Sequence, residues 1–258
     1  MSISYLSNKN KHARDNRITF DEGPHIYTVD NEKYKTSVTG WIHSHFSHFD
    51  SDKIIDKMLT SSKMKDPSYA YFAMTKEQIQ KKWDKNRDEA ANAGTKLHYD
   101  IECYYNGLPV ENSSTEYQFF LRFVQDFPYT PYRTEWVVFY EEYKLCGSID
   151  MVFENPDGTL LIYDWKRCKE IEYDKGLYTK YSITPCISHL PDTNFWHYSL
   201  QLNIYKTILE HKYNKKVVGL FLVCMHPDNP YKTYDRIEVK IMEEEMAQLL
   251  EHRKKEIS

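Results

Sequence analysis

The chain has 258 residues, of which 41% are hydrophobic and 28% charged. This length and apolar content fit one folded domain, or one core domain with a helical appendage, and exclude a chain that is disordered throughout. The net charge of −4 argues against a protein that coats nucleic acid through bulk positive charge. It does not exclude an enzyme acting on nucleic acid, because such an enzyme needs acidic residues to hold cations.

Three absences in the sequence point to an intracellular protein. The first 20 residues contain no apolar stretch of the kind found in signal peptides. The chain also has no run of about 18 apolar residues that would cross a bilayer, so we expect no membrane association. The five cysteines are odd in number and lie at least 18 residues apart, which predicts reduced thiols rather than a disulfide framework or a C-x-x-C site.

The N-terminal part predicts a hairpin followed by helices. Residues 1–16 are polar and are expected to be frayed, and alternating apolar positions over 18–29 predict two short strands. Apolar spacing over 37–58 predicts short helices with a break near 47–51. A capping box at Thr75 opens a long helix that we expect Gly94 to break, with a second helix over 95–105.

Further along, the apolar period changes from helical to strand-like. A helix is predicted over 115–127, and after it the elements are expected in the following order: strands at 134–140, 144–154 and 159–167, a helix at 194–211, strands at 216–225 and 236–241, and a final helix. This order predicts an α/β fold in which helices flank a small mixed sheet. We expect a division into a mainly helical N-terminal extension, residues 1–92, and a core, residues 93–258.

The loop Pro156-Asp157-Gly158 fixes a strand register. Pro starts a type I turn and Gly takes the left-handed position, so a three-residue loop pairs residue 155 with 159 and places Asp150 opposite Asp164. Two facing carboxylates in apolar strands repel each other, and a divalent cation between them removes that repulsion. Lys166 falls on the same side as Asp164 because side chains alternate along a strand. The alternative interpretation is a surface salt-bridge cluster.

Two further pairs have helical i, i+4 spacing. His98 and Glu102 lie on one helical side, where imidazole and carboxylate together reach a cation, or else form a solvated surface. Gln201 and Tyr205 offer neutral donors suited to a phosphate or a base edge. Each pair alone is compatible with an ordinary helix surface.

Taken in order, these motifs resemble the RecB-like branch of the PD-(D/E)XK nuclease superfamily. The series runs G94-T-K-L-H98-Y-D-I-E102, E135-W-V-V, G147-S-I-D150, D164-W-K166 and Q201-L-N-I-Y205, over about residues 94–226. Similar helical N-terminal extensions occur in RecB-like nucleases of phages and large DNA viruses. The resemblance implies a restriction-endonuclease-like core over residues 93–258 and a DNA nuclease that uses Mg²⁺ or Mn²⁺ and leaves a 5′-phosphate and a 3′-hydroxyl. An exonuclease is expected, although the sequence does not decide between exonuclease and endonuclease.

The resemblance also implies a role for each motif residue. The implied metal ligands are His98, Asp150, Asp164 and the backbone carbonyl of Trp165. Lys166 would position the attacking water, and Glu102 would reach the metal through water. The remaining implied roles are support of Lys166 or of the DNA backbone by Gln201 and Tyr205, and a weaker, indirect role for Glu135.

The match departs from the family pattern at two points. Arg167 follows the lysine where many members have a small hydroxyl residue, which leaves the local phosphate contact open. No cysteine precedes His98 and only Cys224 follows residue 186, so we expect no iron–sulfur cluster. The expected partner is DNA with single- or double-stranded ends, and the expected location is the cytoplasm or the site of DNA replication, with a role in DNA repair or recombination.

Two alternatives stay open at this stage. One is a nucleic-acid-binding module on the same fold without catalysis, although that module would be expected to have lost Asp150, Asp164 or Lys166. The other is an unrelated protein whose carboxylates hold a structural ion. The basic clusters Lys81-Lys82-Lys85-Arg87 and Lys166-Arg167-Lys169 are candidates for DNA backbone contacts, although the first is more typical of a solvated helix surface.

Overall fold

The computed structural model describes residues 3–21 and 23–258. The chain separates into two compact units, one made of the residues up to Ser47 together with Leu97–Ser258, and the other of His48–Lys96. This grouping differs from the expected division into residues 1–92 and 93–258. The N-terminal hairpin belongs with the central sheet, and only the middle segment stands as a unit of its own.

The larger unit is built on a five-stranded mixed sheet. Its strand order is β4-β5-β6-β7-β8, and every neighbouring pair is antiparallel except the parallel pair β6 and β7. The expected α/β fold with a small mixed sheet is therefore confirmed. The strands are β4 (Thr130–Tyr140), β5 (Leu145–Glu154), β6 (Leu160–Lys166), β7 (Val217–Cys224) and β8 (Asp235–Glu238).

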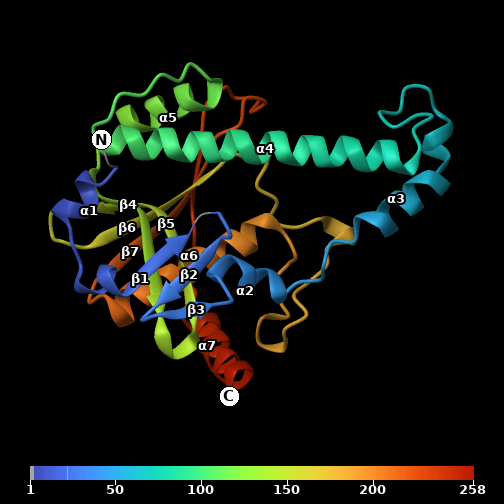
Figure 1. The fold of residues 1–258 in the computed structure, drawn as a ribbon. Helices are drawn as coiled ribbons and strands as arrows, with labels where there is room; N and C mark the ends of the chain where they lie inside the picture. Colours follow the sequence, from blue (N-terminus) through green and yellow to red (C-terminus); the bar gives the residue numbers. More distant parts are fainter. Residues whose placement is uncertain (1–2, 22) are drawn as a thin grey trace. The chain divides into compact units, whose positions relative to one another are not determined.

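Helices cover both sides of this sheet (Figure 1). On one side, α5 (Thr115–Asp126) packs its phenylalanines against Phe153, Tyr163 and Trp165. On the other side lie α6 (Asn194–Lys212), α2 (Val38–Ser44) and α7 (Glu243–Ile257), which share a second apolar cluster with the sheet. Within the described residues, no helix has both the length and the apolar character needed to cross a membrane.

The predicted hairpin between β5 and β6 is confirmed. Gly158 has a φ of +80°, and the Asn155 N–H donates to the Thr159 carbonyl at 2.8 Å. The register that follows pairs Glu154 with Leu160 and Met151 with Tyr163. The turn residues therefore set the strand alignment as expected, because a short loop leaves few ways to pair the flanking strands.

Residues 3–16 are ordered against the sheet rather than frayed, and residues 1–2 of the segment expected to be frayed lie outside the described residues. Helix α1 (Tyr5–Lys9) buries Leu6, and the 3-10 helix η1 (Ala13–Arg17) follows it. The side chain of Asp15 accepts hydrogen bonds from both Arg133 and Trp136 of β4. The expectation of fraying was wrong because polar residues can be ordered by ion pairs to residues distant in the sequence.

A separate three-stranded sheet follows η1. The hairpin of β1 (Ile18–Asp21) and β2 (Ile26–Val29) is confirmed, and β3 (Glu32–Tyr34) adds a third antiparallel strand that the sequence pattern did not reveal. Buried residues of this sheet pack against Phe139 and Cys146 of β4 and β5. The N-terminal extension is thus less helical than expected.

The predicted break at Gly94 does not occur. Helix α4 runs without interruption over Lys76–Tyr105, since a single glycine costs only about 1 kcal/mol in a helix interior and removes no hydrogen bond. The capping box at Thr75 is confirmed, with the Thr75 N–H donating to Gln78 Oε1 at 2.8 Å. Gly107, with a φ of +73°, ends the helix as expected.

The smaller unit contains α3 (Ser51–Thr60), the 3-10 helix η2 (Ser62–Lys65) and the first part of α4. Ile55 and Ile79 are its fully buried side chains, and Lys76 forms ion pairs with Asp52 and Asp56. The predicted helices near 37–58 and their break are confirmed by α2 and α3. Short 3-10 helices complete the larger unit: η3 (Glu141–Tyr143), η4 (Gly176–Tyr178) and η5 (Pro185–Ile187).

Candidate metal centre

The candidate site lies where β5 and β6 separate. Their ladder ends at the pair Met151 and Tyr163, whereas β6 stays paired with β7 as far as Lys166. Beyond that end, Asp150 Oδ2 accepts the backbone N–H of Trp165 at 2.9 Å. A carboxylate has therefore taken the place of a strand carbonyl, which keeps the Trp165 N–H satisfied while the two strands diverge.

His98 of α4 points into this gap. Leu97 and Ile101 on the same helix are buried with the aromatic side chains of α5, and this packing fixes the rotation of the last helical turns. His98 Nε2 lies 2.9 Å from the Trp165 carbonyl oxygen, and Nδ1 lies 3.5 Å from Asp150 Oδ2. The structure thus brings together three of the groups that the resemblance implies as metal ligands, namely His98, Asp150 and the Trp165 carbonyl.

Glu135 of β4 completes the cluster. One ligand atom from each of His98, Glu135 and Asp150 lies within 4.8 Å of the others, and Glu135 Oε1 is 3.8 Å from His98 Nδ1. Ser148 Oγ donates to Glu135 Oε2 at 2.9 Å. Glu135 is therefore itself a candidate metal ligand, which is a larger role than the indirect one that the resemblance implied.

The backbone at Glu135 is unusual and explains its position. Its φ is +41°, a left-handed conformation that costs a residue with a side chain about 1–3 kcal/mol and is concentrated at functional sites. The ladder of β4 and β5 pairs Thr134 with Met151 and Trp136 with Ile149, and it skips Glu135 itself. The signal available in the sequence was only that Glu135 opens the strand next to Asp150.

Asp164 and Lys166 form an ion pair beside the cluster. Lys166 Nζ lies 2.6 Å from Asp164 Oδ2, and both side chains are largely buried. Burial raises the pKa of Asp164 to about 6, although the nearby ammonium opposes this. The buried Asp164 carboxylate already contacts one cation, the Lys166 ammonium, and is a candidate ligand for a second.

Tyr198 is a contact of Lys166 that sequence reasoning missed. The ammonium lies 4.3 Å from the centre of the Tyr198 ring, on the first half of α6. Burial opposes the charge on Lys166, yet the carboxylates of Asp164 and Asp150 raise its pKa above the ordinary value. The lysine is therefore held as a cation between carboxylates and an aromatic face.

Burial and neighbouring charges shift the pKa values of His98, Glu102 and Asp150. Burial disfavours a charged imidazole, but Asp150 and Glu135 raise the pKa of His98 to about 9. Burial and the nearby Glu135 carboxylate raise the pKa of Glu102 to about 7. Burial also raises the pKa of Asp150. A divalent cation would replace the proton on His98 and relieve the repulsion among the carboxylates, and imidazole with carboxylate oxygens is a donor set that accepts Mg²⁺ or Mn²⁺.

Gln201 and Tyr205 lie beneath the site rather than at its surface. Tyr205 is buried and hydrogen-bonds the side chain of Gln201. A methyl group added to Gly147 would meet the Tyr205 hydroxyl oxygen at 2.5 Å, so the glycine makes room for this ring under β5. The buried Tyr205 ring supports the strand that carries Asp150, and the expected support of Lys166 or of a DNA backbone by Gln201 and Tyr205 stays a prediction.

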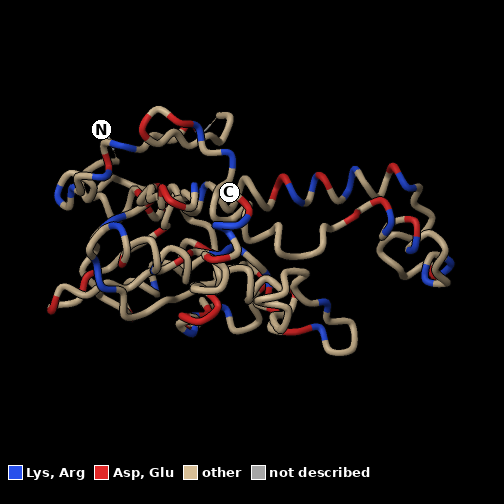
Figure 2. The backbone as a smooth tube through the Cα atoms, turned by 90° about the horizontal axis from the view of Figure 1, so that it is seen from below, with Lys and Arg blue, Asp and Glu red and all other residues tan. Residues whose placement is uncertain are grey.

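Five of the seven cations in the two basic clusters form ion pairs with carboxylates, and Lys82 instead donates to the Ala70 carbonyl at 3.2 Å. On α4, Lys85 pairs with Glu89, and Arg87 pairs with Asp84 and Asp88. Basic and acidic residues alternate along this helix (Figure 2). In the second cluster every cation has a carboxylate partner, with Lys166 on Asp164, Arg167 on Glu116 and Lys169 on Asp228.

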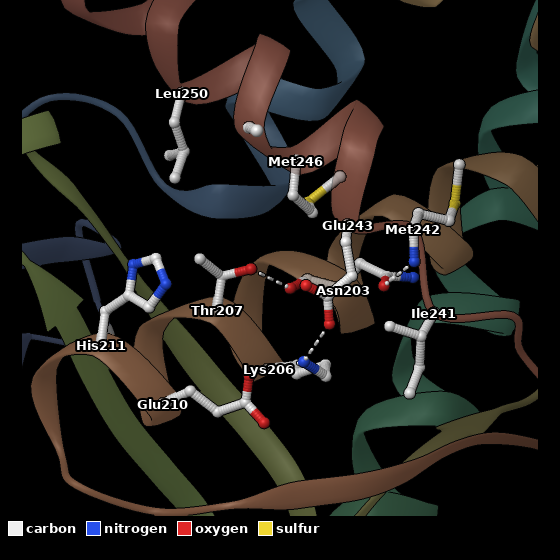
Figure 3. Close-up of a pocket in the computed structure, with 11 residues that line it drawn as sticks. Asn203, Lys206, Thr207, Glu210, His211, Ile241, Met242, Glu243, Met246 and Leu250 are labelled. Atoms are coloured by element: carbon white, nitrogen blue, oxygen red, sulfur yellow. Dashed lines mark hydrogen bonds and ion pairs between the residues drawn. The ribbon is translucent and has the colours of Figure 1, made fainter.

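A separate pocket of about 160 Å³ lies between α6 and α7 (Figure 3). Lys206 lies 2.5 Å from Glu210 and 3.2 Å from Glu243. Asn203 accepts the Met242 N–H at 2.8 Å and donates to the Lys240 carbonyl. Lys206 and Asn203 in this pocket already have protein partners, so they do not point to a ligand.

Neither a known protein-family model nor any curated protein matches this sequence.

Proposed function

We propose that the chain is a divalent-metal-dependent DNA nuclease, specifically an exonuclease, of the RecB-like branch with a restriction-endonuclease-like core. The observation that carries this proposal is the convergence of His98, Glu135 and Asp150 on the gap that also holds the Asp164–Lys166 pair. These residues come from α4 and from three different strands. Packing alone gives no reason to gather them at one point, whereas a metal-assisted phosphodiester hydrolysis requires such a set.

The topology is compatible with this core. Strands β4, β5 and β6 form an antiparallel meander, α6 connects β6 to the parallel β7, and the last turns of α4 lie across one side of the sheet. The motif residues fall on these elements in the order that the resemblance implies. This agreement supports the proposal at the level of fold, while the site residues carry the argument about chemistry.

The residues that would hold the cation are His98, Glu135, Asp150, Asp164 and the Trp165 carbonyl. When bound, Mg²⁺ or Mn²⁺ offsets negative charge on the phosphate and makes water easier to deprotonate. Lys166 would orient a water and stabilise charge on a non-bridging phosphate oxygen. Glu102, whose pKa is about 7, is suited to exchanging a proton near neutral pH.

The test uses end-labelled DNA with EDTA, Mg²⁺ or Mn²⁺. Cleavage is expected only with a divalent cation, and Lys166→Ala is expected to lower its rate by roughly a hundredfold or more. Lys206→Ala is a matched control, because Lys206 is also a buried lysine paired with carboxylates but lies in the separate pocket. Metal-dependent cleavage at a near-parental rate in Lys166→Ala would contradict the proposal, as would the absence of cleavage from linear, end-blocked and circular DNA alike.

A further inference from the structure

Two thiols lie in contact at the end of the strand that carries Lys166. The sulfur atoms of Cys168 and Cys224 are 3.3 Å apart, and the Cys224 thiol donates to the Cys168 carbonyl at 2.8 Å. Both cysteines are free thiols, and the fold brings them together from positions 56 residues apart in the sequence. A disulfide bond needs sulfurs about 2.0 Å apart, so an approach of about 1.3 Å would join them.

The two cysteines differ in their exposure to solvent. Cys168 is partly exposed in the segment that follows β6, whereas Cys224 is buried at the end of β7. The hydrogen bond with Cys224 lowers the pKa of Cys168, and the Lys166 ammonium adds to this effect. Cys168 is therefore the sulfur that an oxidant reaches first, and Cys224 is placed to react with it next.

The pair is connected directly to the candidate catalytic lysine. Cys224 is the partner of Lys166 in the parallel ladder of β6 and β7, and the Met225 N–H donates to the Lys166 carbonyl at 2.8 Å. Cys168 is only two residues beyond Lys166. Drawing Cys168 toward Cys224 would therefore move the end of β6, where the Lys166 ammonium is held against Asp164.

We propose that Cys168 and Cys224 are a reversible oxidation site, in which a disulfide bond displaces Lys166 and lowers the cleavage rate. The effect on cleavage rests on the proposed nuclease function, whereas the oxidation itself does not. A displacement of about 1 Å at a positioned catalytic group lowers rates by up to roughly a hundredfold. The reduced protein is the active form, and reduction of the disulfide restores it.

The reaction with hydrogen peroxide balances in two steps. The Cys168 sulfur attacks one peroxide oxygen, the O–O bond breaks, and a sulfenic acid and one water form. The Cys224 sulfur then attacks the Cys168 sulfur, the S–O bond breaks, and a second water leaves as the S–S bond forms. The two thiols lose two electrons and two protons, and the peroxide takes up both.

The test counts free thiols and measures cleavage in the same samples of the full chain. After treatment with hydrogen peroxide, alkylation under denaturing conditions and mass spectrometry are expected to find three free thiols instead of five, with a peptide that links Cys168 to Cys224. Cleavage is expected to fall by roughly ten- to a hundredfold, and dithiothreitol is expected to restore both values.

Three variants provide the controls. Cys168→Ser and Cys224→Ala are expected to form no such link and to keep their cleavage rate in peroxide. Cys186→Ser removes another partly exposed cysteine and is expected to behave like the parent. Two variants of the pair are used because substitution at the buried Cys224 could disturb folding, while Cys168→Ser changes a partly exposed side chain.

The outcomes separate the two proposals. Five free thiols after peroxide, or a sulfinic acid at Cys168 without the link, would overturn the oxidation site. A complete disulfide with an unchanged cleavage rate would overturn its control of Lys166. If the reduced protein cleaves no DNA, the nuclease proposal fails, and the thiol count still decides the oxidation site by itself.

Discussion

Asp150 Oδ2 accepts the backbone N–H of Trp165 at the point where β5 and β6 separate. This one hydrogen bond allows the strands to diverge without leaving a buried donor unpaired. The same carboxylate oxygen lies 3.5 Å from His98 Nδ1. A single side chain therefore opens the gap between the strands and supplies a candidate metal ligand inside it.

Lys166 and His98 are expected to respond differently to metal. Lys166→Ala should keep metal and DNA binding but lose cleavage by roughly a hundredfold or more, because a positioned proton-transfer or charge-stabilising group is lost. His98→Ala should weaken metal affinity, so that higher Mn²⁺ partly restores its rate. Cleavage rates measured against Mn²⁺ concentration distinguish the two. Near-parental rates for Lys166→Ala at every concentration would show that this lysine has no role in catalysis and that the proposed mechanism is wrong.

Glu135 is expected to act as a ligand rather than as a distant support. Glu135→Gln should lower metal affinity by about tenfold or more, since a neutral amide replaces a carboxylate in the cluster. Ser148→Ala removes only the hydrogen bond to Glu135 Oε2 and should have a smaller effect. Calorimetric titration with Mn²⁺ measures both affinities. Equal losses in the two variants would indicate that orientation of Glu135, and not its charge, matters.

Asp150→Asn tests whether the charge of the Asp150 carboxylate destabilises the metal-free protein. Burial raises the pKa of Asp150, so the folded protein disfavours its charge and the neutral amide should leave the metal-free protein folded and at least as heat-stable as the parent. The stabilisation that Mg²⁺ or Mn²⁺ gives the parent should disappear. Thermal unfolding with EDTA and with each cation provides the measurement. An unfolded Asp150→Asn protein would instead assign this residue a structural role.

Glu102 should make stability depend on pH in the absence of metal. Its pKa rises from the ordinary 4.5 to about 7 in the folded chain, so the folded state binds this proton more tightly than the unfolded state. Its contribution to stability is complete below about pH 4.5 and is lost as the pH rises through about 7. Above pH 7, Glu102→Gln should therefore be more stable than the parent by roughly 1–2 kcal/mol, because solvent screens this partly exposed carboxyl and reduces the full effect of the shift.

Denaturant unfolding in EDTA at several pH values measures this difference. Glu89→Gln, an exposed position on the same helix, is the control and should leave the pH dependence of the parent unchanged. A Glu102→Gln curve parallel to that of the parent between pH 4.5 and 7 would mean that Glu102 keeps its ordinary pKa.

Gly147 and Tyr205 should show coupled effects on stability. Gly147→Ala places a methyl group 2.5 Å from the Tyr205 hydroxyl oxygen, and overpacking of this kind costs roughly 1–3 kcal/mol. Tyr205→Phe removes that oxygen, so the double variant should be more stable than the sum of the two single losses predicts. Unfolding free energies of all four proteins provide the cycle, and strict additivity would rule out the contact.

The sequence by itself determined the parts of the site that depend on short-range geometry. The turn at Pro156-Asp157-Gly158 set the register of β5 and β6 because three residues permit few loop conformations. Helical spacing placed His98 and Glu102 on one side of α4. The mixed α/β fold also followed from the change of apolar period, which reflects burial along each element.

Only the tertiary structure decided how these pieces meet. The contact of His98 with the Trp165 carbonyl joins residues 67 apart in the chain, and no local pattern encodes such a contact. Glu135 entered the cluster through a left-handed backbone conformation that the surrounding sheet enforces against its local preference. Tyr198 met Lys166, and Asp15 anchored the N-terminus to β4, because packed side chains and buried charges choose partners by distance in the fold rather than by distance in the sequence.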